Sequence, residues 1–324
     1  MKKIRVAFIY HESNVFLTGK YFDNIYYNFF MKALNRNEQL IVTNFPTKKI
    51  FDTSILKNNF DVILLWSNSE WGMPEKLENI HNLDIPVIAR AADPADAKKS
   101  IKLHKKWKIN YYFHFFDKSF FYDLYPSHFK YKTIIFGVEP SLFENIIPFK
   151  KRIKNKILNS GAIGNTKIIS KIINSIKNPK WNALQCYNLR TKCCDLSYVD
   201  YTSTLEHSFV NDKYPILLQK YAAAIAANSN NPNAKYWEIS ASGCLTFMEI
   251  TDKNKGKFLG YEDGKNAIFI NEDNYKQKFQ EFLNDSSNPK WEKIANAGRN
   301  YTMKNFNNDV AVSSLVDLMK NLLK

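Results

Sequence analysis

The chain has 324 residues, of which 45% are hydrophobic and 15% aromatic, and its 46 Lys and Arg against 31 Asp and Glu give a net charge of +15. A chain of this length is too long for one ordinary core, so we expect two domains of about 150 residues each. No apolar run reaches the roughly 18–20 residues that a membrane-spanning helix needs, so the sequence predicts none.

The surplus of positive charge favours anionic partners. Nucleotide sugars, anionic lipid carriers, the face of an anionic membrane and nucleic acid all qualify. The basic residues cluster at 98–108 and 150–156. A genome-wide bias toward Lys, Asn and Ile explains the charge equally well, so charge alone does not select among these partners.

The cysteines and histidines show no metal-binding spacing, and we expect no metal site. The four cysteines are Cys186, Cys193, Cys194 and Cys244, and the six His residues are scattered. A reduced, cytoplasmic location is the simplest interpretation.

Apolar strands alternate with amphipathic helical stretches through the first half of the chain, which is typical of a parallel sheet covered on both faces. The expected strands are 5–11, 39–45, 60–67, 84–93, 109–116 and 133–140, with a helix at 21–35. Ligands on such sheets bind beyond the carboxyl ends of the strands. The residues at these ends include His11, Glu12, Ser67, Asn68, Arg90 and Asp93.

The second half repeats the alternation after a polar run that ends at Lys156. A strand leads into the glycine turn that follows Ser160, and a helix is expected at 166–177. The stretch 215–229 supplies a further helix and strand, and 309–324 is an amphipathic helix. We therefore predict an α/β fold with domains at 1–148 and 149–324.

One short helix in the second half carries a single carboxylate. In the segment 231–247, Asn231 or Asn233 can cap the helix, Gly243 can end it, and residues 244–247 read as a buried strand. Free N–H groups at a helix start favour anions and suit a diphosphate. Glu238, which we expect to be partly exposed, would oppose a phosphate. It should instead bind a neutral group such as the two hydroxyls of a ribose.

Four segments of the chain resemble the CgeB-like (spore-maturation) branch of the group 1 glycosyl transferases: WEISASG, FLGYEDGKNAIFI, NPKWEKIANAGRNYTMKNF and IIFGVEPSLF. The resemblance implies the GT-B fold, in which two Rossmann-like domains face each other across a deep cleft. The N-terminal domain would then bind the acceptor and the C-terminal domain the nucleotide-sugar donor. The last helix, at about 308–324, would pack back on the N-terminal domain.

The same resemblance implies a glycosyltransferase that moves a hexose from a nucleotide-diphosphate sugar to an acceptor hydroxyl without a metal ion. The co-substrate would be a UDP- or GDP-sugar, and no other cofactor is implied. Many relatives carry two glutamates eight residues apart, of which Glu238 matches the second, ribose-binding one. Asn230 stands in place of the first, so its role is in doubt, although Asn228 or Asn230 can hydrogen-bond a sugar hydroxyl.

The turn after the strand at 156–160 is a second candidate phosphate site. Gly161 lets backbone N–H groups approach a phosphate, Asn165 lies in the same turn, and Lys167 supplies charge. Lys235, one turn before Glu238, is a further candidate for a phosphate contact. A plain structural turn and a solvated lysine are equally consistent with the pattern.

A general base for the acceptor hydroxyl should come from the first domain. Asp93 follows a strand, and Pro94 enforces a turn after it, so Asp93 is our first choice. His11, at the end of the first strand, is the second. Asp93 as a simple helix cap fits the sequence equally well.

Two other functions remain open. The basic stretch 98–108 with nearby aromatic residues allows a nucleic-acid-directed glucosyltransferase or a nucleic-acid-binding protein, and a nucleotide-sugar epimerase is a minor alternative. The acceptor can be a glycan, a lipid carrier, a protein or a nucleic acid. The oligomeric state is not indicated.

Overall fold

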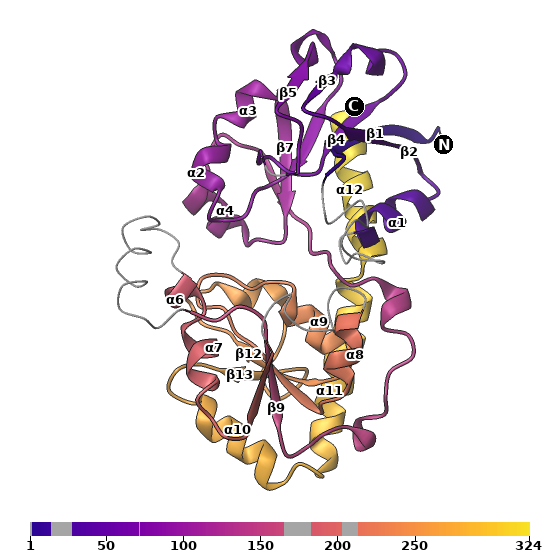
Figure 1. The fold of residues 1–324 in the computed structure, drawn as a ribbon. Coiled ribbons are helices and arrows are strands. Elements are labelled where there is room, and N and C mark those ends of the chain that lie inside the picture. Colours follow the sequence, from indigo (N-terminus) through magenta and orange to yellow (C-terminus); the bar gives the residue numbers. More distant parts are fainter. Residues whose placement is uncertain (1, 14–27, 71, 165–182, 203–212) are drawn as a thin grey trace. The chain divides into compact units, whose positions relative to one another are not determined.

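The computed structural model describes residues 2–13, 28–70, 72–164, 183–202 and 213–324 (Figure 1). The chain forms two compact units: Met1–Phe136 together with Asn308–Lys324, and Gly137–Asn307. The first stretch of this unit thus ends at Phe136, 12 residues before the boundary predicted at residue 148. The first unit also takes in the last helix of the chain.

The first unit is built on a six-stranded parallel sheet with strand order β2-β1-β4-β6-β7-β8. The strands are β1 Ile4–His11, β2 Leu40–Thr47, β4 Val62–Leu65, β6 Val87–Arg90, β7 Ile109–His114 and β8 Tyr131–Thr133. The last strand is shorter and earlier than the predicted 133–140. Its partner β7 ends at His114, whose carbonyl accepts from the Ile134 amide at 2.8 Å, so the ladder has no partner beyond that point.

Short helices surround this sheet. They are α1 Asn28–Arg36, α2 Ala97–Ser100, α3 Leu103–Lys106, α4 Lys118–Leu124 and α12 Asn308–Leu322. Two further strands, β3 Ile50–Asp52 and β5 Lys76–Glu78, form a small separate sheet that the sequence analysis did not anticipate. Part of the helix predicted at 21–35 lies outside the described residues.

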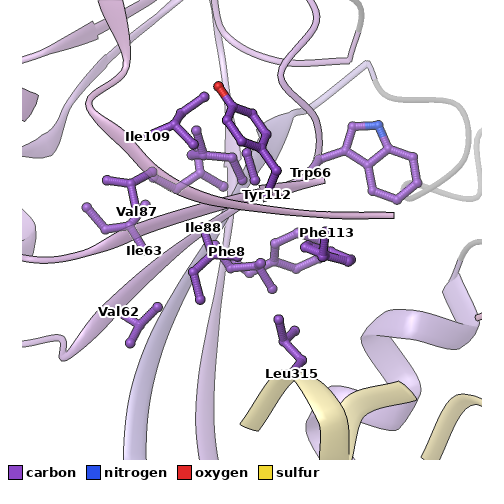
Figure 2. Close-up of a cluster of buried hydrophobic side chains, with 14 of the residues drawn as sticks. Phe8, Val62, Ile63, Trp66, Val87, Ile88, Ile109, Tyr112, Phe113 and Leu315 are labelled. Atoms are coloured by element: carbon purple, nitrogen blue, oxygen red, sulfur yellow. The ribbon is translucent and has the colours of Figure 1, made fainter. Parts of the chain in front are cut away.

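The last helix completes the core of the first unit. Leu315 of α12 is fully buried and points at the face of the sheet where Phe8 and Phe113 lie (Figure 2). Successive residues of a strand point to opposite faces. Tyr112 therefore lies on the other face, where its ring stacks on Phe129 with centroids 5.3 Å apart. The amphipathic pattern at the end of the sequence thus covers the sheet that begins the chain.

The second unit has a five-stranded parallel sheet with order β10-β9-β11-β12-β13. Its strands are β9 Ile157–Ser160, β10 Val199–Thr202, β11 Ala223–Ala226, β12 Leu245–Glu249 and β13 Ile268–Ile270. Its helices are α6 Ala183–Cys186, α7 Asn188–Cys193, α8 Tyr214–Gln219, α9 Lys235–Ala241, α10 Tyr275–Asn284 and α11 Pro289–Asn305. The helix predicted at 166–177 lies outside the described residues.

Local signals explain where α9 ends and where α11 begins. The cap of α9 expected from Asn231 or Asn233 is wrong, because Ala234 is the N-cap residue and no side-chain hydrogen bond caps the helix at that position. Gly243 has φ +72° and its amide bonds to the Ser240 carbonyl at 2.9 Å, so the glycine ends α9 as the sequence predicts. The side chain of Asn288 caps α11 by accepting from the Lys290 amide at 3.0 Å, and Pro289 occupies the first turn. The strand after Gly243 is confirmed as β12.

Gly298 allows α11 to lie close to the loop that precedes β13. A Cβ at this position would be 2.4 Å from the Asn266 carbonyl oxygen, a backbone atom that cannot rotate away. We expect Gly298→Ala to destabilise the protein by about 1–3 kcal/mol through overpacking, which exceeds the gain of about 1 kcal/mol in helix propensity. Urea unfolding measures the difference, with the exposed Asn296→Ala on the same helix as the control. A stabilised Gly298→Ala would contradict the close approach.

Candidate functional site

Three segments of the second unit meet at the carboxyl edge of its sheet. They are the turn after β9, the loop after β11 and the start of α9. β9 lies between β10 and β11, so the connections from β9 and from β10 leave toward opposite sides of it. Such switch points are where open α/β sheets bind ligands.

Arg190 of α7 ties two of these segments together. Its side chain is buried, with 1% of the residue exposed. Nη1 donates to the Ala162 carbonyl, after β9, at 2.9 Å, and Nη2 donates to the Ala227 carbonyl, after β11, at 2.5 Å. In the described part of the chain no carboxylate pairs with this guanidinium. The sequence analysis did not identify Arg190, whose surroundings read as an ordinary polar helix.

Lys235, the first residue of α9, lies beside Arg190 and over Gly161. Gly161 has φ +99°, and a Cβ on it would be 2.4 Å from Lys235 Cε and 3.4 Å from Arg190 Nη1. Lys235 Nζ is 3.3 Å from the hydroxyl of Tyr214 and 4.7 Å from its ring centroid. The positive φ favours glycine at 161, and a larger residue there would also force the end of the Lys235 side chain to move.

The charge of Lys235 is unfavourable in this place. Part of the residue is exposed, but its ammonium group lies among Gly161, Tyr214 and Arg190. Burial, with a smaller effect of the Arg190 charge, lowers the pKa of Lys235 to about 7. Two basic groups therefore share one site. Among the described carboxylates, Glu249 interacts with the Arg190 charge, but none forms an ion pair with either cation, so the site still favours an anion.

Glu238 lies one turn further along α9 and is buried, with 3% of the residue exposed. This corrects the expectation of partial exposure: residues 236–241 are all buried because α9 packs against α8, α11, β11 and β12. Its Oε1 is buried without a hydrogen-bond partner in the described residues. Burial raises the pKa of Glu238 well above its usual range. The described residues thus leave one oxygen of this carboxyl group without a hydrogen bond.

The two asparagines after β11 shape their own loop. Asn228 Oδ1 accepts from the amides of Asn230 and Asn231 at 3.1 and 3.4 Å. Asn230 Nδ2 lies 2.9 Å from the sulfur of Cys186. Both side chains are therefore engaged within the protein, although their loop borders the site.

A pocket of about 330 Å³ opens near the ends of β12 and β13 and is lined by Gln185, Asn188, Lys253 and Glu272. Asn188 Nδ2 donates to Glu272 Oε1 at 2.6 Å. All four lining residues carry polar side chains, and the pocket lies on the same edge of the sheet as the charged site. The candidates Asn165 and Lys167 lie outside the described residues.

The first unit holds the two candidate bases, at the ends of different strands. Asp93 is exposed after β6, and its carboxylate makes no hydrogen bond or ion pair with any other described side chain. His11, at the end of β1, accepts from the Ser13 amide through Nδ1 at 3.0 Å. Because a backbone N–H can only donate, Nδ1 holds the lone pair and the proton of the neutral ring lies on Nε2.

No model of a known protein family matches the chain, and no curated protein matches it. Solved structures do. A glycosyltransferase from Rickettsia africae has a TM-score of 0.58 at 10% identity over 100% of both chains. Sucrose-phosphate synthase from Thermosynechococcus elongatus has 0.60 at 9% over 99% of both. HepE from Anabaena, in complex with UDP-glucose, has 0.56 at 11% over 98% of this chain and 100% of that chain.

The chain has the GT-B glycosyltransferase fold. This agrees with the two parallel-sheet units, each of the Rossmann-like type that the sequence predicts. The narrower likeness to the CgeB-like branch has no counterpart among these matches. At identities near 10% the agreement concerns the fold, and the site must be argued from its own residues.

The described residues contain neither a metal-binding cluster nor a membrane-spanning helix. No cluster of three or more His, Cys, Asp or Glu side chains there is placed to hold a metal ion. None of the helices described is long and apolar enough to cross a membrane. The four cysteines are free thiols.

The lowered pKa of Lys235 makes stability depend on pH. The folded state holds this proton with a pKa of about 7, against an ordinary value of 10.5. The unfolded chain therefore binds more protons between these values, and Lys235 destabilises the fold most below pH 7. We expect Lys235→Met to be more stable than the wild type at pH 6, by a margin that shrinks toward pH 9.

Urea unfolding of both proteins at pH 6 and pH 9 checks this expectation. Lys293→Met, which removes an exposed lysine from α11, is the control and should show a difference that does not change with pH. An equal margin at both pH values for Lys235→Met would mean that its ammonium group is not buried against Arg190.

Proposed function

We propose that the protein is a glycosyltransferase of the CgeB-like branch, which moves a hexose from a UDP- or GDP-sugar to an acceptor hydroxyl without a metal ion. The observation that carries the proposal is the pair Arg190 and Lys235 beside Gly161, with the unused carboxyl group of Glu238 one turn away. Two cations that form no ion pair with a described carboxylate, and a carboxyl oxygen without a described partner, match the two halves of a nucleoside diphosphate.

The diphosphate would lie against Lys235 and the turn after β9. An ammonium recognises phosphate as a point charge, and a bound anion would favour the charged form of Lys235, which burial disfavours. Arg190 donates to the Ala162 and Ala227 carbonyls, so it fixes the positions of the two segments that border the site. Its positive charge would attract the diphosphate without a direct hydrogen bond. Lys167 and Asn165 remain candidates in the same turn.

The ribose would lie against Glu238. Burial has excluded water from this carboxyl group, so a pair of ribose hydroxyls supplies the partners that the protein does not. Asn228 and Asn230 border the site through their loop, and their role toward the sugar is secondary in this proposal, since their side chains already bond within the protein. HepE, of the same fold, was solved with UDP-glucose, which supports a uridine nucleotide.

The proposed reaction uses residues of both units. The acceptor oxygen forms a bond to the anomeric carbon while the bond from that carbon to the diphosphate oxygen breaks, and the diphosphate leaves with the electron pair. Lys235, Arg190 and the start of α9 offset the charge that develops on it, the role that a metal plays in other transferases. Asp93 accepts the proton of the acceptor hydroxyl. His11 is the weaker choice. Its Nδ1 already accepts from the Ser13 amide, and the Nε2 of the neutral ring carries a proton, so Nε2 has no lone pair to accept another.

The free thiols fit a reducing compartment, and we place the protein in the cytoplasm on that ground.

Two ligands separate the roles of Lys235 and Glu238. We expect Glu238→Ala to weaken UDP binding by about 5- to 150-fold, the equivalent of about 0.5–1.5 kcal/mol for each of two hydrogen bonds with the ribose hydroxyls, and to leave inorganic pyrophosphate binding unchanged. Lys235→Met should weaken both ligands. Calorimetric titration in EDTA measures the affinities and tests metal independence at the same time.

Glu238→Gln, which keeps the size of the side chain and part of its hydrogen bonding, should lose less than Glu238→Ala. If neither UDP nor pyrophosphate binds the wild type, or if Glu238→Ala weakens both equally, the donor assignment is wrong.

Asp93 can be tested as the general base. We expect Asp93→Asn to keep UDP affinity while cutting turnover by about 100- to 10,000-fold, the usual contribution of a general base. Asp96→Asn, three residues later in the same turn, is the matched control and should keep normal turnover. Release of UDP from the UDP-sugar with an accepted acceptor measures the rate. Normal turnover in Asp93→Asn together with its loss in His11→Ala would move the base to β1.

A further inference from the structure

A second arginine lies at the carboxyl edge of the other sheet, in the first unit. Arg90 is the last residue of β6 and is partly exposed. Its guanidinium lies 4.5 Å from the ring centroid of Trp66, and its Nε donates to the Trp66 carbonyl at 3.1 Å. The Trp66 indole and carbonyl, just after β4, thus hold the arginine in one orientation.

Most of the hydrogen-bonding capacity of Arg90 is unused. A guanidinium has five N–H donors. Nε is bound to Trp66, and Nη1 lies at the long distance of 3.5 Å from His114 Nε2. Three N–H groups remain, and in the described part of the chain no carboxylate pairs with Arg90. An arginine in this state is prepared for a bidentate bond to an outside anion.

The neighbours of Arg90 are polar and neutral. Ser67 and Asn68 follow β4 and are 1% and 0% exposed. Asn68 accepts from the Ala92 amide through Oδ1 at 2.5 Å. His114 at the end of β7 is fully buried, and burial with the Arg90 charge keeps its pKa well below the ordinary value, so the ring adds no charge. None of these three neighbours carries a charge that offsets the positive charge of Arg90.

The position in the sheet also points to a ligand. β1 lies between β2 and β4, so the connections that leave β1 and β2 go to opposite sides, and ligands bind beyond the strand ends at such a switch point. Trp66, Ser67 and Asn68 follow β4 at this place, and the Asn68 amide donates to the Arg90 carbonyl at 2.9 Å. Arg90 thus borders the crevice from the next strand along.

We propose that Arg90 recognises an anionic group, a phosphate or a carboxylate, on the acceptor. The proposal rests on the proposed function in one respect, since it takes the ligand of the first unit to be the acceptor. It narrows the acceptors to those that carry a negative charge close to the reacting hydroxyl. The two N–H groups of Nη2 and the remaining one of Nη1 would bind the anion, while Trp66 keeps the guanidinium plane fixed.

The test titrates inorganic phosphate into the full chain at constant ionic strength, with the donor site filled by saturating UDP. We expect Arg90→Gln to weaken phosphate binding at least tenfold and Arg90→Lys to lie between the two, because an ammonium lacks the fork. Lys99→Gln, which removes an exposed charge from α2, is the control and should change the affinity less than twofold. Melting temperatures show that each variant is folded.

Three hexoses that differ only at C6 then separate the two anions. Glucose 6-phosphate carries a phosphate, glucuronate a carboxylate, and glucose neither. The wild type should bind one of the anionic sugars at least tenfold more tightly than glucose, and Arg90→Gln should abolish that preference. Equal binding of all three sugars, absence of phosphate binding, or unchanged binding in Arg90→Gln would each overturn the proposal.

The two proposals fail in different ways. If UDP does not bind, the proposed donor site is wrong, and the phosphate titration is run instead in the Lys235→Met background, where the second unit has lost its ammonium group. Loss of phosphate binding in Arg90→Gln would then still establish an anion site in the first unit.

Discussion

Arg190 joins the turn after β9 to the loop after β11. It bonds to the carbonyls of Ala162 and Ala227, which are 65 residues apart in the sequence. Burying a guanidinium among carbonyl groups without a carboxylate is costly unless its hydrogen bonds are made. Both Nη atoms do make them, while Nε is buried without a partner among the described residues, so the cost is offset only in part. The positive potential that remains then decides what else this edge of the sheet can hold.

Lys235 shows the consequence most directly. Packed over Gly161 and beside Arg190, it titrates with a pKa of about 7 instead of remaining charged. The site is thus less stable than a neutral side chain would make it, which is the usual sign of a residue kept for function and not for folding. An anion that enters here gains from two cations, and it also removes a repulsion already present in the protein.

Much of the fold could be predicted from the sequence because its signals are local. The apolar runs that became β1, β4, β6 and β7, and the glycine that ends α9, depend on neighbours within a few residues. Arg190 could not be found in this way, because its contacts lie 28 and 37 positions away and its helix reads as ordinary polar sequence.

Glu238 was identified from a motif, but its burial was not. Six of the seven residues of α9, 236–241, are buried, since α8, α11, β11 and β12 all pack on the helix. A helix covered on every side has no amphipathic period to read. The burial of α9 depends on elements that lie far from it in the sequence. The raised pKa of Glu238 is a consequence of that burial, so it could not be predicted either.

The two arginines Arg90, at the end of β6, and Arg190, on α7, show how position alone is a poor guide to role. Each lies at the carboxyl edge of a parallel sheet beside an aromatic ring, Arg190 near Tyr187 at 4.9 Å and Arg90 over Trp66 at 4.5 Å. Arg190 is buried and spends both Nη atoms on backbone carbonyls, so it supports its loops and acts on a ligand mainly through charge. Arg90 is partly exposed and keeps three donors free. Counting the donors that the protein itself uses therefore separates an arginine that builds a site from one that binds at it.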